Sequence, residues 1–395
     1  MLREIKRVKK SDKSMKPTSI KEIGDIAGKK VLLRLDLNVP MKDGQVVEDF
    51  RIRKSMPTLN FLISRGAKVI IISHCEGNKG ATDNTLKPVF EHLKNTLPTA
   101  SPIFFVEDYV NEDTVATVGA LKNGEILLFE NLRKYEGEKE NDADFTKSLA
   151  GLADLFVNEA FSVSHREHAS IVGIPKLLPS FIGLLFESEI EHLSKTFNPP
   201  RPFLFVLGGA KFGTKMPLIK KFLEIADTVF VGGALANDCF KALGYNVGTS
   251  VVSDGNFDLK DIVLNKKIVL PVDVVVKGDR NIDVKSPQEV RDDEMILDAG
   301  SEAILQLGEL VENSKYVLWN GPLGNFEIGF REGTLELAKK IAEISAESVV
   351  GGADTLAAIA SLNLEEKFNF VSSGGGAMLD FLANETLPGI EALKK

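Results

Sequence analysis

The sequence predicts an α/β protein made of two doubly wound domains, each a parallel β-sheet covered by helices. Short apolar runs rich in β-branched residues alternate with helix-length amphipathic stretches along the chain. This alternation is typical of parallel strands joined by helical crossovers. The chain has 395 residues, which is more than one hydrophobic core usually supports. We therefore expect two domains of similar architecture.

The elements can be assigned in chain order from these runs. The first half has strand candidates at 30–36, 68–73, 102–108, 125–130 and 154–161, with helical stretches such as 53–66 between them. The second half repeats the scheme at 203–209, 228–234, 267–276, 315–321, 348–354 and 369–376. A charged helical pattern between the halves stops at Pro199 and Pro200, because proline cannot continue a helix. We expect an N-terminal domain at 1–185, a connecting helix and linker at 186–200, and a C-terminal domain at 201–382.

The composition excludes several classes of protein. The net charge is -8, which argues against bulk nucleic-acid or membrane-surface binding, and no apolar run approaches the length of a membrane span. Only two cysteines are present, too few for a disulfide framework, so we expect a reducing, cytoplasmic setting. Any anion site must therefore be a local feature of the surface.

The loops after the first-half strands carry cationic and hydrogen-bonding side chains. Open α/β sheets bind ligands at the carboxyl ends of their strands, and arginine can hold a phosphate or carboxylate through two parallel hydrogen bonds. Taken singly, such residues usually form surface ion pairs or cap helices, but together they predict a site for a small, highly charged anion. The residues are Asp36, Asn38, Arg51, His74, Arg133, His165, Arg166 and His168.

The second-half strands end in glycines instead. Glycine lets the backbone approach a phosphate or a flat ring closely. Several such turns along one sheet predict a nucleotide site, although tight-turn chemistry alone explains any single pair. The turns are Gly208–Gly209, Gly232–Gly233, Gly351–Gly352 and Gly374–Gly376.

Charged residues follow two of these glycine turns. Lys211 and Lys215 are spaced four apart, so we expect them on one face of a helix whose free N-terminal N–H groups suit a phosphate. Asp354 and Thr355 either cap the next helix or meet a metal ion held by phosphates. Neither a P-loop motif nor a G-x-G-x-x-G turn after the first strand occurs, so the site must be built differently.

Several longer strings of residues occur along the chain in a characteristic order and spacing. They are RLDLNVP (34–40), FENLRKYEGEKEND (129–142), VNEAFSVSHREHAS (157–170), LGGAKFGTK (207–215), WNGPLGNFE (319–327), GGADT (351–355) and SSGGGA (372–377). In this order and spacing, from about Lys16 to the C-terminal LPGIEALKK, the chain closely resembles the phosphoglycerate kinase family. No single string would be sufficient.

The resemblance implies two Rossmann-like domains joined by a hinge helix, with residues from about 383 to 395 completing the N-terminal domain. It implies reversible phosphoryl transfer between 1,3-bisphosphoglycerate and ADP, giving 3-phosphoglycerate and ATP in glycolysis and gluconeogenesis, with Mg²⁺. We expect a cytoplasmic monomer that binds neither nucleic acid nor membrane. Because the sugar acid and the nucleotide bind to different domains, the domains are expected to close for transfer.

The resemblance also implies a role for each matching position. The catalytic residues would be Arg51, Lys211, Lys215 and Gly375. The phosphoglycerate side would comprise Asp36, Asn38, Arg51, His74, Arg133 and Arg166. The nucleotide side would comprise Gly209, Lys211, Lys215, Gly233, Asn320, Glu327, Gly351, Gly352, Asp354 and Thr355, with Glu327 near the ribose and Asp354 as the magnesium ligand.

The chain departs from the family pattern at one informative place. Members usually read SHLGRPKG where this chain reads SHCEGNKG (73–80), so Gly77 replaces an arginine that contacts phosphoglycerate and Glu76 adds a negative charge. Losing one charged hydrogen bond of about 1.5–3 kcal/mol lowers affinity by about one to two orders of magnitude unless Lys79 compensates. The alternative function is therefore a divergent nucleotide-binding paralogue with weakened phosphoglycerate binding. A nicotinamide-dependent dehydrogenase also remains open, but it would need the missing fingerprint.

Overall fold

The computed structural model describes residues 16–76, 84–97, 101–109, 111–255, 257–279 and 281–394. The chain divides into two compact units. Unit 1 comprises Met1–Ser188 together with Thr386–Lys395, and unit 2 comprises Glu189–Glu385. Across the described ranges, no helix is both long and apolar enough to cross a membrane.

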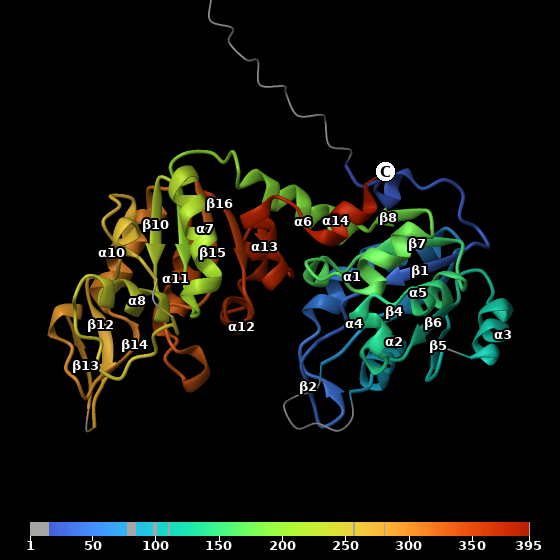
Figure 1. The fold of residues 1–395 in the computed structure, drawn as a ribbon, viewed down its shortest axis with the longest axis horizontal. Coiled ribbons are helices and arrows are strands. Elements are labelled where there is room, and N and C mark those ends of the chain that lie inside the picture. Colours follow the sequence, from blue (N-terminus) through green and yellow to red (C-terminus); the bar gives the residue numbers. More distant parts are fainter. Residues whose placement is uncertain are drawn as a thin grey trace, which may run out of the picture. The chain divides into compact units, whose positions relative to one another are not determined.

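Unit 1 is built on a six-stranded parallel sheet with the strand order β5-β6-β4-β1-β7-β8 (Figure 1). The chain adds strands on both sides of β1, which is the doubly wound arrangement predicted from the sequence. The strands are β1 (Lys30–Arg34), β4 (Lys68–Ile72), β5 (Ile103–Val106), β6 (Ile126–Phe129), β7 (Leu155–Asn158) and β8 (Ser180–Ile182), beside a small hairpin of β2 (Met41–Lys42) and β3 (Gln45–Val46). The α-helices are α1 (Phe50–Ser64), α2 (Lys87–Thr96), α3 (Glu112–Ala120), α4 (Glu136–Glu140), α5 (Ala143–Ala150) and α14 (Pro388–Leu393).

The C-terminal helix α14 belongs to unit 1. It lies beside β8 in Figure 1, and the Gly389 N–H donates to the Ser164 carbonyl oxygen at 2.8 Å. A Cβ at Gly389 would lie 2.7 Å from the Ser164 Cβ, so glycine is needed for this close approach.

Unit 2 is built on a second six-stranded parallel sheet, with the order β11-β10-β9-β15-β16-β17. The chain again adds strands on both sides of its first strand, so the predicted fold class is confirmed. The strands are β9 (Phe203–Leu207), β10 (Thr228–Val231), β11 (Ile268–Val269), β15 (Tyr316–Asn320), β16 (Glu347–Gly351) and β17 (Phe370–Val371). The α-helices are α7 (Phe212–Ile225), α8 (Ala234–Ala242), α9 (Lys260–Val263), α10 (Ser301–Glu312), α11 (Glu332–Glu343), α12 (Ala353–Ser361) and α13 (Gly376–Asn384).

The stretch 267–276, which the sequence predicts as one strand, forms parts of two strands in different sheets. β11 ends before Pro271, and β12 (Val274–Lys277) begins after it, because proline lacks the N–H that a continuous ladder needs. β12 pairs in antiparallel fashion with β13 (Ile282–Lys285) and β14 (Met295–Ala299). Unit 2 therefore has an additional antiparallel layer that the sequence analysis did not predict.

Helix α6 (Leu184–Lys195) begins and ends earlier than the predicted connecting helix. The buried Glu159 carboxylate caps its first turn, accepting hydrogen bonds from the backbone N–H groups of Leu185 at 3.0 Å and Phe186 at 3.1 Å. It also accepts one from the Thr58 hydroxyl. Burial disfavours the charged carboxylate more than these donors favour it, so the pKa of Glu159 rises to about 8.

A pH dependence of stability follows from this shift. Because the pKa of Glu159 is about 8 in the folded chain and 4.5 for an ordinary glutamate, the folded state holds an extra proton between these values. We expect the free energy of unfolding to fall as the pH rises from about 5 to about 8, because unfolding releases that proton and a higher pH favours the release. Glu159→Gln, which cannot titrate, should reduce this slope. Urea unfolding of both proteins near the two ends of this range measures the effect, and equal slopes would contradict it.

Candidate functional site

The predicted anion-binding residues of unit 1 gather at the carboxyl edge of its sheet. Asp36 follows β1, His74 follows β4 and Arg133 follows β6, and these three strands are neighbours in the sheet. Arg166 follows β7, and Arg51 lies on α1. Hydrogen bonds, ion pairs and charge interactions link these residues into a network that we call the basic cluster. It comprises Arg34, Asp36, Asn38, Arg51, His74, Arg133 and Arg166.

Asp36 holds Arg51 at one side of the basic cluster. Arg51 Nη1 lies 3.1 Å from Asp36 Oδ2 and donates to the Asn38 carbonyl oxygen at 2.8 Å. Burial favours the neutral acid, but neighbouring cations and hydrogen-bond donors, Arg51 first among them, outweigh it, so the pKa of Asp36 is lowered. The ionised carboxylate therefore fixes the position of the guanidinium.

Arg34 is a fully buried cation that the sequence analysis missed. Its Nε donates to the Ser170 hydroxyl at 2.9 Å, and its Nη2 lies 3.2 Å from His74 Nδ1. Because arginine can only donate, His74 Nδ1 must accept, and the neutral ring carries its proton on Nε2. Burial and then the Arg34 charge hold the pKa of His74 well below its usual value. His74 is therefore a neutral N–H donor. The sequence signal that could have revealed Arg34 is a charged residue within an otherwise apolar strand.

Arg133 has hydrogen-bonding capacity that the described structure does not use. Its side chain is only 10% exposed, and its Nε and Nη2 atoms are buried without a hydrogen-bond partner among the described residues. Burial and the charge of Arg166 lower the pKa of Arg133. Because buried donors normally have partners and an unpaired charge is costly to bury, these N–H groups indicate a site for an anion.

Glu76 lies between the two arginines. Its Oε1 is 3.2 Å from Arg133 Nη1 and 3.5 Å from Arg166 Nη1. Gly77 and Lys79, where the chain departs from the family pattern, lie outside the described residues.

The two other predicted histidines stand beside the basic cluster. His165 Nε2 lies 3.4 Å from Arg166 Nε. His168 Nδ1 lies 3.9 Å from the buried Glu138 carboxylate, and burial followed by the charges of nearby arginines lowers the pKa of His168 to about 4. His168 is therefore neutral near pH 7 and adds no charge to the cluster.

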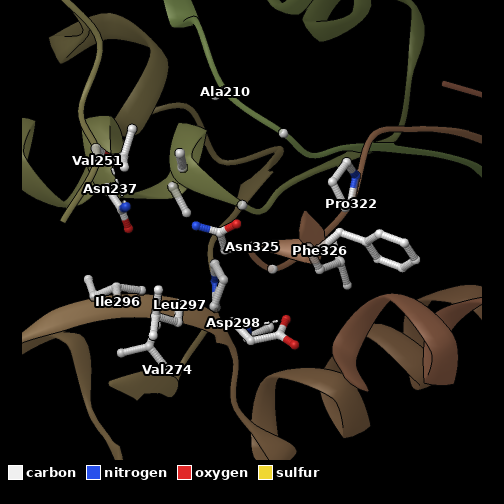
Figure 2. A pocket seen from close by; sticks show the side chains of 18 of the residues that line it. Ala210, Asn237, Val251, Val274, Ile296, Leu297, Asp298, Pro322, Asn325 and Phe326 are labelled. Atoms are coloured by element: carbon white, nitrogen blue, oxygen red, sulfur yellow. Dashed lines mark hydrogen bonds between the residues drawn. The ribbon is translucent and has the colours of Figure 1, made fainter. Parts of the chain in front are cut away.

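Unit 2 contains a pocket of about 260 Å³ where β9, β10 and β15 end (Figure 2). Backbone atoms after these strands form one side, and apolar side chains of β12 and β14, such as Val274 and Leu297, form another. Four of the predicted nucleotide-side residues line it: Gly209, Gly233, Glu327 and Asp354.

Glycine is required where the turns meet around this pocket. Gly233 has a φ of 61°, and a Cβ there would lie 2.6 Å from Gly209 N and 2.8 Å from the Pro322 carbonyl oxygen. The Gly209 N–H in turn donates to that carbonyl at 2.8 Å. The turns therefore pack backbone against backbone, which leaves a wall without side chains that suits a flat ring.

The two predicted lysines occupy different environments. Lys211 does not lie on the helix as the sequence analysis expected, because it has a left-handed φ of 67° and α7 begins after it, at Phe212. Lys211 is exposed. Lys215 lies in the first turn of α7 and donates to the Gly208 carbonyl oxygen at 2.6 Å. Burial lowers the pKa of Lys215 to about 8, against the opposing charge of Asp354.

Asn320, Gly352 and Thr355 lie together beside the pocket but do not form its wall. A Cβ at Gly352 would be 3.5 Å from both Asn320 Nδ2 and Thr355 Oγ1. Thr355 Oγ1 accepts a hydrogen bond from the Gly321 N–H at 3.1 Å, so this hydroxyl joins β15 to α12. Gly351 is the last residue of β16.

Gly375, a predicted catalytic residue, also lies outside the pocket wall. It precedes α13 with a φ of 52°. Its positive φ explains the glycine, since other residues rarely adopt this conformation.

Asn237 lines the pocket and was not predicted. It is 2% exposed, its Nδ2 donates to the Val251 carbonyl oxygen at 3.0 Å, and its Oδ1 has no partner within the described part of the chain. In Figure 2 its amide faces the space above Ile296 and Leu297. Because Nδ2 is engaged, Oδ1 is free to accept a hydrogen bond from a ligand. A polar residue on the buried side of a helix after a glycine pair is the signal that could have revealed it.

Asp354 and Glu327 place carboxylates in the pocket wall. Burial and then the repulsion of Glu327 raise the pKa of Asp354, while Lys215 opposes the rise. In the ranges that the structure describes, no group of three His, Cys, Asp or Glu side chains could hold a metal ion. A metal at Asp354 would take its other ligands from phosphates and water, which is how Mg²⁺ usually binds.

Comparisons of the sequence with known proteins agree with the motif resemblance. A family model described as phosphoglycerate kinase matches residues 20–385. Phosphoglycerate kinase of Pseudothermotoga lettingae is 42% identical over 96% of this chain and 99% of its own length. Phosphoglycerate kinase of Dictyoglomus turgidum is 40% identical over 94% of this chain and 96% of its own length.

Solved structures give the same result. Phosphoglycerate kinase from Pyrococcus horikoshii OT3 matches with a TM-score of 0.83 at 31% identity, and that from Coxiella burnetii with a TM-score of 0.79 at 35% identity. Each match covers 95% of this chain and 98% of the solved chain. These likenesses do not favour the divergent-paralogue alternative over the kinase.

Replacing Gly233 by alanine tests the packing of the pocket turns. Gly233→Ala forces a Cβ against two backbone atoms and strains a positive φ, so we expect a loss of about 2–5 kcal/mol in the free energy of unfolding. Gly244→Ala is the matched control, because Gly244 also has a positive φ, of 85°, but nothing lies within 4 Å of an added Cβ. It should lose only about 1–2 kcal/mol. Equal losses in denaturant titrations would contradict the close packing.

Proposed function

The chain belongs to the phosphoglycerate kinase family and is a phosphotransferase, and from this premise we propose that it transfers a phosphoryl group reversibly between 1,3-bisphosphoglycerate and ADP. The products are 3-phosphoglycerate and ATP, which places the reaction in glycolysis and gluconeogenesis. We further propose that the chain acts as a cytoplasmic monomer.

The single observation that supports the acid substrate best is the pair of donors on Arg133 that have no partner among the described residues. Two buried N–H groups of a cation call for an anion, and 3-phosphoglycerate carries both a phosphate and a carboxylate. In the proposal, Arg133 and Arg166 bind this charge, His74 donates from Nε2, and Asp36 and Asn38 bind the hydroxyl group of the acid. This assigns the phosphoglycerate side to unit 1.

The nucleotide side is assigned to unit 2. The glycine wall at Gly209 and Gly233 accepts the flat base, and Glu327 accepts from the ribose hydroxyls. Lys215, held beside the end of β9, meets the phosphates together with Lys211. The 260 Å³ pocket supports this assignment because it is lined by apolar groups with a few polar ones, as nucleoside pockets are.

Mg²⁺ completes the nucleotide site in this proposal. Asp354 is the protein ligand, and the nucleotide phosphates and water supply the remaining oxygens. The ion would neutralise phosphate charge when bound. The carboxylate of Asp354 fits this role because burial and then repulsion from Glu327 raise its pKa, and a bound cation would favour the ionised form.

Phosphoryl transfer between these substrates requires the protein to position them and to stabilise charge. The acceptor in the ATP-consuming direction is a carboxylate, which is already ionised near pH 7, so no general base is needed. What remains is to hold two anions in line and to stabilise the charge of the phosphoryl group in flight. Arg51, Lys211 and the N-terminus of the helix that follows Gly375 supply positive charge for this purpose.

Removing the Lys211 amine tests the catalytic role. Lys211→Ala should lower kcat by several hundredfold, equivalent to about 3–4 kcal/mol at the transition state, with a much smaller change in the KM for ATP. The exposed Lys220, on the helix that follows Lys211, provides the control, because Lys220→Ala removes the same charge away from the predicted site. A coupled assay of ATP consumption measures both. Equal losses in kcat and nucleotide affinity for Lys211→Ala would refute the role.

Asn237 is proposed to recognise the base. Its Oδ1, which has no partner in the described part of the chain, can accept a hydrogen bond from the amino group of adenine, whereas guanine presents a carbonyl oxygen at the same ring position. Asn237→Leu should raise the KM for ATP about tenfold and leave the KM for GTP nearly unchanged. The exposed Asn384, at the end of α13, gives the control Asn384→Leu. A parallel rise in both KM values would indicate that leucine merely obstructs the pocket, and the assignment would fail.

A further inference from the structure

The carboxylate of Glu76 occupies the place where the basic cluster would otherwise present its charge to an anion. One oxygen, Oε1, contacts both Arg133 at 3.2 Å and Arg166 at 3.5 Å. These are two of the cations that the proposed function assigns to the substrate. The described part of the protein thus contains an anion of its own inside the anion site.

The backbone of Glu76 is fixed while its side chain is not. The Glu76 N–H donates to Asn38 Oδ1 at 2.9 Å, which holds the residue against the cluster. The side chain is 53% exposed, and among the described residues it engages the guanidinium groups through a single oxygen and forms no bidentate pair. Such an exposed pair is weak and its carboxylate can rotate into water.

The contact with Glu76 does not engage all the hydrogen-bond donors of the basic cluster that are described. Arg133 meets Glu76 through Nη1, while its Nε and Nη2 remain without partners in the described structure. A tetrahedral dianion can reach several guanidinium N–H groups at once and carries twice the charge of a carboxylate. A phosphate group can therefore displace Glu76, whereas a monovalent anion gains little by doing so.

We propose that Glu76 is a tethered competitor of the substrate, which lowers the affinity of the basic cluster for anions in general and thereby selects phosphate-bearing acids over monovalent anions. This inference rests on the proposed function for the identity of the substrate. It makes Glu76 a determinant of substrate affinity and specificity, and it gives a physical role to a negative charge that otherwise only opposes substrate binding.

The test compares Glu76→Gln with wild type. Removing the charge while keeping the shape should lower the KM for 3-phosphoglycerate roughly three- to tenfold, with kcat changed less than about twofold, because two ion pairs to a half-exposed carboxylate are lost. Glu107→Gln is the matched control, since Glu107 is exposed in the same unit, pairs with Lys87 and has no contact with the basic cluster. It should change neither constant.

Monovalent anions give the second readout. Acetate should inhibit Glu76→Gln at lower concentrations than it inhibits wild type, while the relative effect of inorganic phosphate should change less. A Glu76→Ala variant, which cannot form a new hydrogen bond, should follow Glu76→Gln in both measurements.

Three results would overturn the inference: an unchanged KM, a raised KM, which would mean that Glu76 positions the arginines productively, or an equal fall in Glu107→Gln. Failure of the proposed function is a separate outcome. If wild type shows no turnover of 3-phosphoglycerate, calorimetric binding of inorganic phosphate to the full chain decides the inference alone. Tighter binding by Glu76→Gln than by wild type supports it, and equal or weaker binding overturns it.

Discussion

A parallel sheet brings the carboxyl ends of all its strands to one edge, and both candidate sites depend on this constraint. In unit 1 the loops after β1, β4, β6 and β7 meet there and assemble a cluster of cations from residues far apart in sequence. In unit 2 the turns after β9, β10 and β15 meet in the same way, but they carry glycines and leave a pocket. One architecture therefore provides a charged site in one unit and a flat-walled site in the other.

The charge of the first site is local, because the chain as a whole is acidic. Burying Arg34 is costly unless its donors are paired, and the partners at Ser170 and His74 meet that need while fixing the tautomer of the histidine. Arg133 has two buried donors without a partner among the described residues, so its desolvation is fully compensated only when an anion binds. The donors of Arg133 are thus fully paired only when an anionic ligand binds, and the Glu76 carboxylate partly takes the place of that ligand.

The sequence was sufficient for the fold class, because apolar runs report strands. It also placed the predicted anion-site residues of unit 1 at the ends of strands, and the structure brings most of them to one edge of the sheet. The sequence was insufficient where the local structure depends on contacts with residues that are distant in the sequence. Pro271 divides an apolar run between two sheets, Lys211 takes a left-handed conformation before its helix, and Arg34 looks like an interruption of a strand. The free oxygen of Asn237 and the contact of Glu76 with Arg166, 90 residues away, depend on packing that no local pattern reports.

The central claim is that unit 1 binds the sugar acid at the basic cluster and unit 2 binds the nucleotide at the glycine-walled pocket. A crystal structure of the protein with 3-phosphoglycerate, ADP and Mg²⁺ tests it most directly. The account predicts an anionic group of the acid on Arg133 Nε and Nη2 with Glu76 displaced, and the base against Gly233 with the metal on Asp354. The acid bound elsewhere on unit 1, or a nucleotide outside the pocket, would contradict it.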